Sequence, residues 1–285
     1  MADDLPTLVH HACVKYCRLP LVFDAVAMAR EVAALPAAIW TPHFNTDYHD
    51  GGWSGVALRS PGGDSAQLYP DPQAIHEYAD TAVRAECPTI DAALSAFGDA
   101  LCSARLLALA PGSCIREHRD YGLNLESGTA RLHIAVVSGL NVEFYLDGEL
   151  MPMEPGECWY LNLDLPHRVQ NLGETDRVHL VIDCEATDWL LAQLPGPDQR
   201  RQQVEMIERR GAQIDSAQQR LERFRRHALA DADLRVVLQA EEDRDSFIGR
   251  VVAEGRRRGI GFTAEDVRSA MDASRRAWTE RWLVR

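Results

Sequence analysis

The sequence lacks the features that mark membrane-spanning, secreted and disulfide-stabilised proteins. No apolar run approaches the ~20 residues that a bilayer-spanning helix needs. The N-terminal stretch MADDLPTLVHH is acidic and has no basic segment, so the sequence predicts no signal peptide. The seven cysteines are odd in number and follow no framework spacing. Free thiols are typical of a reducing compartment, and we therefore expect a cytoplasmic protein with no membrane partner.

Two kinds of zinc site are also missing. Cys13 and Cys17 are four residues apart, but no second pair follows at a spacing typical of zinc, and we interpret both as ordinary thiols. No helical His-Glu-x-x-His run supplies the ligands and glutamate base of a zinc hydrolase. The sequence therefore argues against both a zinc ribbon and a zinc peptidase.

Positive charge is scarce in the main body of the chain. The net charge is −13, and the first 199 residues hold 11 basic and 28 acidic side chains. An acidic surface of this size argues against nucleic acid as a partner. The segment from Arg200 onward holds 19 arginines and 15 acidic residues. Because its charges are mixed in sign, we interpret it as solvated helical surface, with contact to an acidic partner as the alternative.

The N-terminal third of the sequence predicts mixed structure. Apolar residues recur at helical spacing over Leu21–Leu35, which predicts a helix. The Trp- and Gly-rich stretch Trp40–Gly63 is typical of strands and loops. Residues Pro72–Gly98 predict two short helices that are broken at Pro88.

From Arg105 to Asp183 the pattern becomes one of short strands. They are expected at 104–110, 131–138, 142–148, 157–163 and 177–184, separated by turns rich in Gly, Pro, Asn and Asp. Several short strands at near-regular spacing favour an antiparallel sandwich or barrel. Past Gln193–Gln203 the period becomes helical, and Thr263 with the acidic residues after it predicts the start of a helix. We therefore expect a mainly β domain over residues 1–195 and a helical domain over residues 200–285.

The stretch CIREHRDYGLN places His118 and Asp120 two residues apart. In an extended segment their side chains point to the same side, because side chains alternate with a period of two. Two histidines and one carboxylate on one face of the metal form the site of mononuclear non-haem iron(II) enzymes, with other positions left open. His167 follows a proline at the end of an expected strand and is the third candidate ligand.

Cationic residues accompany these ligands. Arg177 opens a strand ten residues after His167 and is suited to bidentate binding of a carboxylate. Arg131 and His133 share one face of another strand, where burial without an anionic partner would be costly. A dicarboxylate such as 2-oxoglutarate needs one such clamp at its distal end, while its 2-oxo acid end chelates the metal.

Each of these residues has an ordinary structural explanation. His133 alternates with apolar residues and could be a core histidine with satisfied hydrogen bonds. Asp120 could be a turn residue, and Arg177 and Asp183 could flank a strand with their charges in water. The order His-x-Asp, Arg-x-His, His and then Arg ten residues later, all within one expected β region, favours the site.

Four motifs, REHRD, RLHIAV, MEPGECWYLNLDLPHRVQN and DRVHLVID, carry a resemblance to a known family. Leu107–Asp188 resembles the aspartyl/asparaginyl β-hydroxylases, a branch of the cupin-like 2-oxoglutarate/iron(II) dioxygenases. It looks closest to the bacterial proline 3-hydroxylase type. Trp40–Gly63 is similar to the N-terminal region of that family, and the resemblance covers about two thirds of the chain. It implies a double-stranded β-helix core, also called a jelly roll, with helices added.

The resemblance also implies the metal ligands. His118, Asp120 and His167 match the positions that bind iron(II). Some members of the family lack the carboxylate ligand and use two histidines. Asp120 is present in this sequence, which favours the complete triad.

The cosubstrate and the reaction follow from the same resemblance. Arg177 matches the clamp for the distal carboxylate of 2-oxoglutarate, and Arg131 and His133 match positions that line the cosubstrate or substrate site. The implied cofactors are iron(II), 2-oxoglutarate and O2. The implied reaction is hydroxylation of a C–H bond of an amino acid or aminoacyl side chain, with decarboxylation of 2-oxoglutarate to succinate.

Residues on the substrate side are harder to choose. His43, Asn45 and Arg59 come from the Trp- and Gly-rich stretch, and Arg59 would pair with an amino-acid carboxylate unless it is a surface arginine. Trp159 and Asn171 match family positions, with scaffold packing or turn formation as the alternatives.

The C-terminal residues 221–278 resemble the nitrogen-fixation-associated leader-peptide domain family, through the turn DADLR and the helix entry GIGFTAEDV. A lid or a dimerisation element is the alternative, and a homodimer through these helices is one expectation. If the resemblance reflects function, the substrate is a residue in a ribosomal precursor peptide that the helices contact. An alternative of another class is a non-catalytic cupin-like sensor that binds a small carboxylate.

Overall fold

The structure is a computed structural model that describes residues 14–43, 45–49, 51–69, 76–139, 141–211, 216–241 and 243–272, with the side chain of residue 218 excepted. Its contacts divide the chain into two compact units, Met1–Ala212 and Gln213–Arg285, which are described separately. Among the described residues, no helix is long and apolar enough to cross a membrane. The six described cysteines are free thiols; Cys13 lies outside the described residues.

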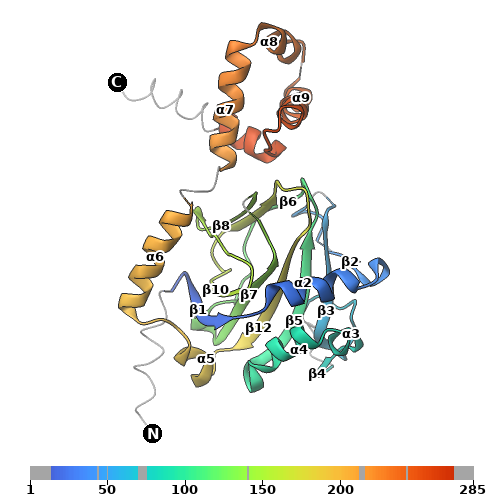
Figure 1. Ribbon diagram of the computed structural model, residues 1–285, viewed down its shortest axis with the longest axis vertical. Helices are drawn as coiled ribbons and strands as arrows, with labels where there is room; N and C mark the ends of the chain where they lie inside the picture. Colours follow the sequence, from blue (N-terminus) through green and yellow to red (C-terminus); the bar gives the residue numbers. More distant parts are fainter. Residues whose placement is uncertain are drawn as a thin grey trace. The chain divides into compact units, whose positions relative to one another are not determined.

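The first unit is built on two antiparallel sheets (Figure 1). The larger sheet has the order β1-β10-β7-β12-β5-β3-β2, with β4 paired to β3, and the smaller has the order β6-β11-β8-β9. The larger sheet contains β1 (Tyr16–Val22), β2 (Thr41–Pro42), β3 (Trp53–Pro61), β4 (Tyr78–Asp80), β5 (Leu101–Leu109), β7 (Thr129–Val137), β10 (Glu157–Leu161) and β12 (Arg177–Glu185). The smaller contains β6 (Cys114–His118), β8 (Val142–Leu146), β9 (Glu149–Leu150) and β11 (His167–Asn171).

From β5 to β12 the chain passes back and forth between the sheets. β5, β7, β10 and β12 lie in the larger sheet, and β6, β8, β9 and β11 in the smaller. This winding is that of a jelly roll and confirms the predicted double-stranded β-helix. All five strands expected from the sequence are present, whereas the short strands β6, β9 and β11 and the edge strand β1 were not predicted.

The alternation of side chains in the central strands separates a core face from a polar face. In β12, Leu180 and Ile182 belong to the core under the helices, whereas Arg177, Val181 and Asp183 line a cavity between the sheets. The strands on either side, β5 and β7, repeat the arrangement with alternate apolar and polar residues. A period of two therefore directs the charged residues of the larger sheet to one side.

Helices cover the other face of the larger sheet (Figure 1). They are α2 (Ala25–Ala34), α3 (Ala82–Ala85), α4 (Pro88–Ser95) and α5 (Asp188–Ala192). The unit also has three 3-10 turns, of which η1 (Ala37–Ile39) follows α2, η2 (Gly98–Ala100) follows α4 and η3 (Leu125–Ser127) precedes β7. The break predicted at Pro88 is present, because this proline occupies the first turn of α4. The helix predicted over Leu21–Leu35 begins only at Ala25, since Leu21 and Val22 belong to β1.

Helix α6 (Pro197–Gly211) belongs to the first unit. The Gln203 side chain bonds both the N–H and the C=O of Arg18 on β1. Arg210 pairs with Glu157 on β10, with Nη1 2.9 Å from Oε2. The division between units therefore follows residue 212, one helix later than the boundary expected from the sequence.

The second unit consists of α7 (Ala217–Ala230), α8 (Ala232–Gln239), α9 (Arg244–Arg257) and the helical residues 264–272, as the sequence predicts for this region. Phe224, Ile248 and Phe262 are central to its own apolar core. The predicted helix start is confirmed, because Thr263 Oγ1 accepts from Asp266 N–H and Asp266 accepts from Thr263 N–H.

Candidate metal centre

A cavity of about 460 Å³ lies in the first unit and is lined by residues of both sheets. Inward-facing residues of β5, β7 and β12 form one wall, and β6, β8 and β11 contribute the other. Histidine, arginine and aspartate side chains stand among apolar ones on this lining. A mostly apolar cavity with a few convergent polar groups is the usual form of a small-molecule site.

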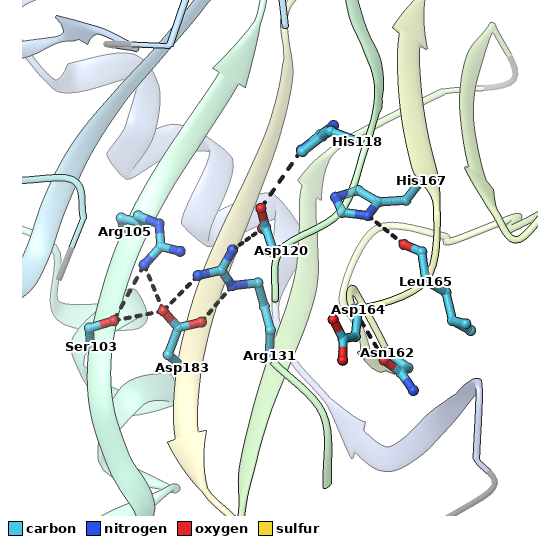
Figure 2. Close-up of polar contacts among 10 residues, drawn as sticks. All are labelled: Ser103, Arg105, His118, Asp120, Arg131, Asn162, Asp164, Leu165, His167 and Asp183. Carbon is cyan, nitrogen blue, oxygen red and sulfur yellow. Dashed lines mark hydrogen bonds and ion pairs between the residues drawn. The ribbon is translucent and has the colours of Figure 1, made fainter. Parts of the chain in front are cut away.

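His118, Asp120 and His167 come together at this cavity (Figure 2). His118 ends β6 and His167 begins β11, and the two are paired in register, with ring centroids 4.2 Å apart. Asp120 follows β6, and its Oδ1 is 3.9 Å from His118 Nε2. One ligand atom from each residue lies within 4.8 Å of the others. Within the described ranges this is the one group of three or more such side chains that could hold a metal ion.

Backbone hydrogen bonds orient both histidines. His118 Nδ1 is 2.8 Å from the carbonyl oxygen of Arg116, and His167 Nδ1 is 3.0 Å from that of Leu165. A carbonyl oxygen only accepts, so each Nδ1 carries the proton and each Nε2 keeps its lone pair for a metal. Burial lowers the pKa of His167 to about 4, so that its imidazole is neutral at pH 7. The donor set and its protonation therefore fit a two-histidine, one-carboxylate iron(II) site.

A chain of charged residues holds Asp120 in place (Figure 2). Arg131 Nη1 donates to Asp120 Oδ2 at 2.6 Å, while Arg131 Nε and Nη2 donate to the two oxygens of Asp183 at 2.6 and 2.9 Å. Asp183 also accepts from Arg105 Nη1 and Ser103 Oγ, each at 3.0 Å. Burial alone would raise the pKa of Asp183, but the charges of Arg105 and Arg131 hold it far below its usual range. One buried carboxylate thus fixes both arginines.

We expect Asp183→Asn to destabilise the first unit by roughly 3 kcal/mol, because removing one partner of a buried ion pair leaves uncompensated charge. The substitution preserves the shape of the side chain but leaves Arg105 and Arg131 without their shared anion. Urea unfolding would measure the loss, with Asp198→Asn as the control, since the Asp198 side chain is 90% exposed. Equal unfolding midpoints for the two variants would contradict the expectation.

Arg177 is a buried cation of a different kind. Arg177 is 2% exposed, and its Nη2 donates to Nδ1 of His179 at 2.8 Å. Among the described residues, no carboxylate lies within ion-pair distance of it, and its buried Nε has no partner. Burial lowers the pKa of Arg177 to about 9, so the guanidinium is still charged at neutral pH. An unbalanced charge at this depth fits an anionic ligand in the cavity.

Comparison with known proteins assigns the family. The family model described as Aspartyl/Asparaginyl beta-hydroxylase matches residues 26–187, which is more than half of the chain. The chain belongs to this family. The residues that converge on the cavity from β5, β6, β7, β11 and β12 all fall within the matched range.

One curated relative and two solved structures are similar to this family member at low sequence identity. L-proline cis-4-hydroxylase of Rhizobium meliloti (strain 1021) is 27% identical over 169 residues, which cover 58% of this chain and 59% of the relative. This chain thus spans about 59% of the relative's length. A 2OG-Fe(II) oxygenase family oxidoreductase from Burkholderia pseudomallei is 16% identical with a TM-score of 0.41, over 64% of this chain and 90% of that one. A prolyl-4-hydroxylase from Pseudomonas putida is 14% identical with a TM-score of 0.38, over 64% and 100%. The fold therefore rests on the strand order of the chain itself.

Most of the expected cosubstrate and substrate residues of the family member line the cavity. Arg131 and His133 both do so, but three donors of Arg131 bind Asp120 and Asp183, so Arg131 supports a candidate metal ligand. His43 and Asn45 also line the cavity. Their roles as ligand contacts stay predictions.

Aromatic rings form the wall next to the candidate metal ligands. His43 stacks on Trp53 with centroids 3.5 Å apart, and Tyr48 stacks on His118 at 4.8 Å. Burial, followed by the charge of His49, lowers the pKa of His43 to about 4, so this ring is neutral at pH 7. Tyr48 and Trp53 were not singled out from the sequence, because isolated aromatics in a loop-rich stretch carry no local signal of a site.

Two expected substrate residues lie elsewhere. The strand register shifts between Ala57 and Arg59, and Arg59 pairs with Asp80 in a separate hollow shared with Arg84 of α3. Arg59 therefore does not line the cavity, and the prediction that placed it there is corrected. Trp159 is fully buried in the core and donates Nε1 to Glu157, so it too is absent from the lining.

Asn171 and Arg105 complete the comparison with the sequence. Asn171 Nδ2 donates to the carbonyl oxygens of Leu109 and Thr175, which is the turn-forming role named as its alternative. Arg105 was not proposed as a site residue, although it is 6% exposed and lines the cavity. The signal that could have identified Arg105 is its position as the one charged residue in the otherwise apolar strand ARLLALA.

Proposed function

We propose that the chain is an iron(II)- and 2-oxoglutarate-dependent dioxygenase that hydroxylates a C–H bond of an amino acid or aminoacyl side chain. One observation carries the proposal: the His118, Asp120 and His167 cluster opens into the same cavity as a buried, uncompensated Arg177. An amino-acid substrate is supported by the curated relative, which is an L-proline cis-4-hydroxylase.

His118, Asp120 and His167 would hold the iron(II) ion. Bound iron(II) with 2-oxoglutarate supplies the chemistry that adds one atom of O2 to the substrate and the other to succinate, with release of CO2. Each histidine offers its Nε2 atom to the metal, since its Nδ1 donates to a backbone carbonyl. Arg131 holds one oxygen of Asp120 and leaves the other facing His118.

Arg177 would bind the distal carboxylate of 2-oxoglutarate. A guanidinium presents paired N–H donors that match the two oxygens of a carboxylate. The residue is buried at the start of β12, where water is excluded and a charged hydrogen bond is strong. His133 lines the same cavity, and its buried Nε2 has no partner among the described residues.

The charge of the cavity favours a further carboxylate. The buried Arg105 and Arg177 and the largely buried Arg131 face two carboxylates, Asp120 and Asp183. The charges of iron(II) and the 2-oxoglutarate dianion cancel, so one positive charge stays unbalanced. The carboxylate of an amino-acid substrate would neutralise it. The peptide-substrate and sensor alternatives gain no support from the described residues.

The test is turnover of free amino acids and short peptides, with L-proline first, by the purified chain in air. We expect one substrate to gain the mass of one oxygen atom, with one succinate formed for each product and no product when iron(II) or 2-oxoglutarate is omitted. Mass spectrometry measures both products. Binding of 2-oxoglutarate without succinate formation under any substrate would contradict the proposal and favour the sensor.

A further inference from the structure

The hydrogen-bond partner of Arg177 is a histidine rather than a carboxylate. Arg177 and His179 are both on the inward face of β12, at 2% and 1% exposure, with Nη2 2.8 Å from Nδ1. Two other arginines of the cavity lining, Arg105 and Arg131, pair with Asp183. His179 is not among the residues that line the cavity, although Arg177 and His133 are. Among the described residues, the hydrogen-bond contacts of the His179 side chain are those with Arg177 and His133.

This contact fixes the protonation of His179. A guanidinium only donates, so Nδ1 of His179 carries a lone pair and its proton is on Nε2. His133 Nδ1 is 3.3 Å from His179 Nδ1. Because His179 Nδ1 accepts, His133 Nδ1 is the donor, and Nε2 of the neutral His133 ring carries no proton. Burial, and then the charge of Arg177, hold the pKa of His179 well below its usual value. Arg177 is thus held by a neutral acceptor.

We propose that His179 is a positioning residue that orients the Arg177 guanidinium for a ligand carboxylate while leaving its positive charge uncompensated. This inference rests on the proposed function, because the carboxylate in question is the distal one of 2-oxoglutarate. A neutral acceptor fixes the guanidinium with one hydrogen bond and leaves its other donors to the ligand. A carboxylate at the same place would satisfy Arg177 internally and repel the incoming anion.

The neutral partner of Arg177 leaves a buried positive charge without an anion in the free protein. A buried arginine without an anionic partner lowers the stability of the fold. Arg105 and Arg131 avoid this cost because both pair with Asp183, whereas Arg177 has no such partner in the described part of the chain. In the free protein Arg177 has one side-chain hydrogen bond among the described residues, to His179, and its Nε has no partner there. Binding of a dicarboxylate would supply the missing anion. A ligand with a second carboxylate therefore binds more tightly than one without it, because only the former pairs with Arg177.

Two isosteric variants separate charge from shape. His179→Asn places a neutral amide oxygen near the position of Nδ1, whereas His179→Asp places a negative oxygen there. We expect the asparagine variant to bind 2-oxoglutarate within about 5-fold of the wild type, and the aspartate variant to bind it roughly 100-fold more weakly, because a like charge at this depth is poorly screened. His179→Leu removes the acceptor and should weaken binding by about 10-fold, the value of one lost hydrogen bond.

The measurement is anaerobic calorimetry of the full iron(II)-loaded chain with 2-oxoglutarate. Iron(II) affinity should be the same for all variants, because His179 contacts none of the metal ligands. The matched ligand is 2-oxovalerate, which has the same carbon chain without the distal carboxylate, and its affinity should change by less than about 3-fold in the aspartate variant. In turnover, the aspartate variant should raise KM for 2-oxoglutarate and leave kcat near its wild-type value.

The outcomes separate this inference from the proposed function. Failure of the wild type to bind 2-oxoglutarate would overturn the proposed function and this inference with it. Tight binding by the wild type with equal affinities for the aspartate and asparagine variants would overturn the role of charge at residue 179 alone. Wild-type affinity in the leucine variant would overturn its positioning role. Thermal unfolding of each variant shows whether it is folded, and the asparagine–leucine pair keeps the test intact if the aspartate variant is not.

Discussion

Replacing His118 with alanine is expected to abolish both iron(II) binding and succinate formation. The substitution removes one of three ligand atoms that lie within 4.8 Å of one another. Loss of an outer partner of a metal ligand already lowers metal affinity by about 10- to 100-fold, and loss of the ligand itself should exceed this. Anaerobic iron(II) titration and a succinate assay measure the two effects separately.

The control for this variant is His227→Ala, which removes an exposed histidine on α7 in the second unit. It should leave iron(II) binding and turnover unchanged. Near-normal succinate formation by the His118 variant would end the account of the metal site, because no other group of three such ligands occurs among the described residues.

Replacing Arg177 with leucine is expected to weaken 2-oxoglutarate binding by about 30-fold or more, because truncating one partner of a buried charged pair costs roughly 2–5 kcal/mol. Stability should be unchanged or higher, since the variant no longer buries a cation that lacks an anion. The combination separates loss of a ligand contact from damage to the fold. Calorimetry gives the affinity, and thermal unfolding gives the stability.

Arg177→Lys refines this test, because lysine keeps the charge and loses the planar fork. Its affinity for 2-oxoglutarate should fall between those of the wild type and the leucine variant. Arg30→Leu, on the exposed side of α2, is the control and should bind 2-oxoglutarate as the wild type does. Unchanged affinity in the leucine variant would show that the cosubstrate is held elsewhere.

The metal triad could be predicted because its signal is largely local. His118 and Asp120 are two residues apart, and His167 follows a proline at the end of an expected strand. The pairing of β6 with β11, which sets His118 opposite His167, involves a separation along the chain that no local pattern encodes. The residue types and their spacing indicate the candidate ligands, and the jelly-roll winding brings these side chains together.

The charged network around Asp183 could not be predicted for the same reason. Asp183 meets Arg131 because β12 pairs with β7, and it meets Ser103 because β12 pairs with β5. From the sequence, Asp183 was assigned no role in the site, and a charge in water beside a strand was the ordinary explanation considered for it. The pairing of β12 with two neighbouring strands makes Asp183 the shared partner of Arg105 and Arg131.

Errors at the edges of the larger sheet have local causes. The strand β1 contains Pro20, which an edge strand tolerates, and the helical pattern that follows it obscured the strand. Arg59 was expected in the cavity from its place in a Trp- and Gly-rich stretch, but an irregularity in the β3–β5 pairing directs it to Asp80. Register shifts of this kind depend on the partner strand and leave no mark in the sequence of one strand.

The central claim is that one cavity of this chain holds iron(II) and 2-oxoglutarate together. Anaerobic calorimetry with iron(II), followed by 2-oxoglutarate, tests it most directly. The account predicts one iron(II) per chain and then one 2-oxoglutarate, with the first step lost in His118→Ala and the second weakened in Arg177→Leu. Absence of stoichiometric iron(II) binding by the folded wild-type chain, or 2-oxoglutarate binding that is indifferent to both substitutions, would contradict it.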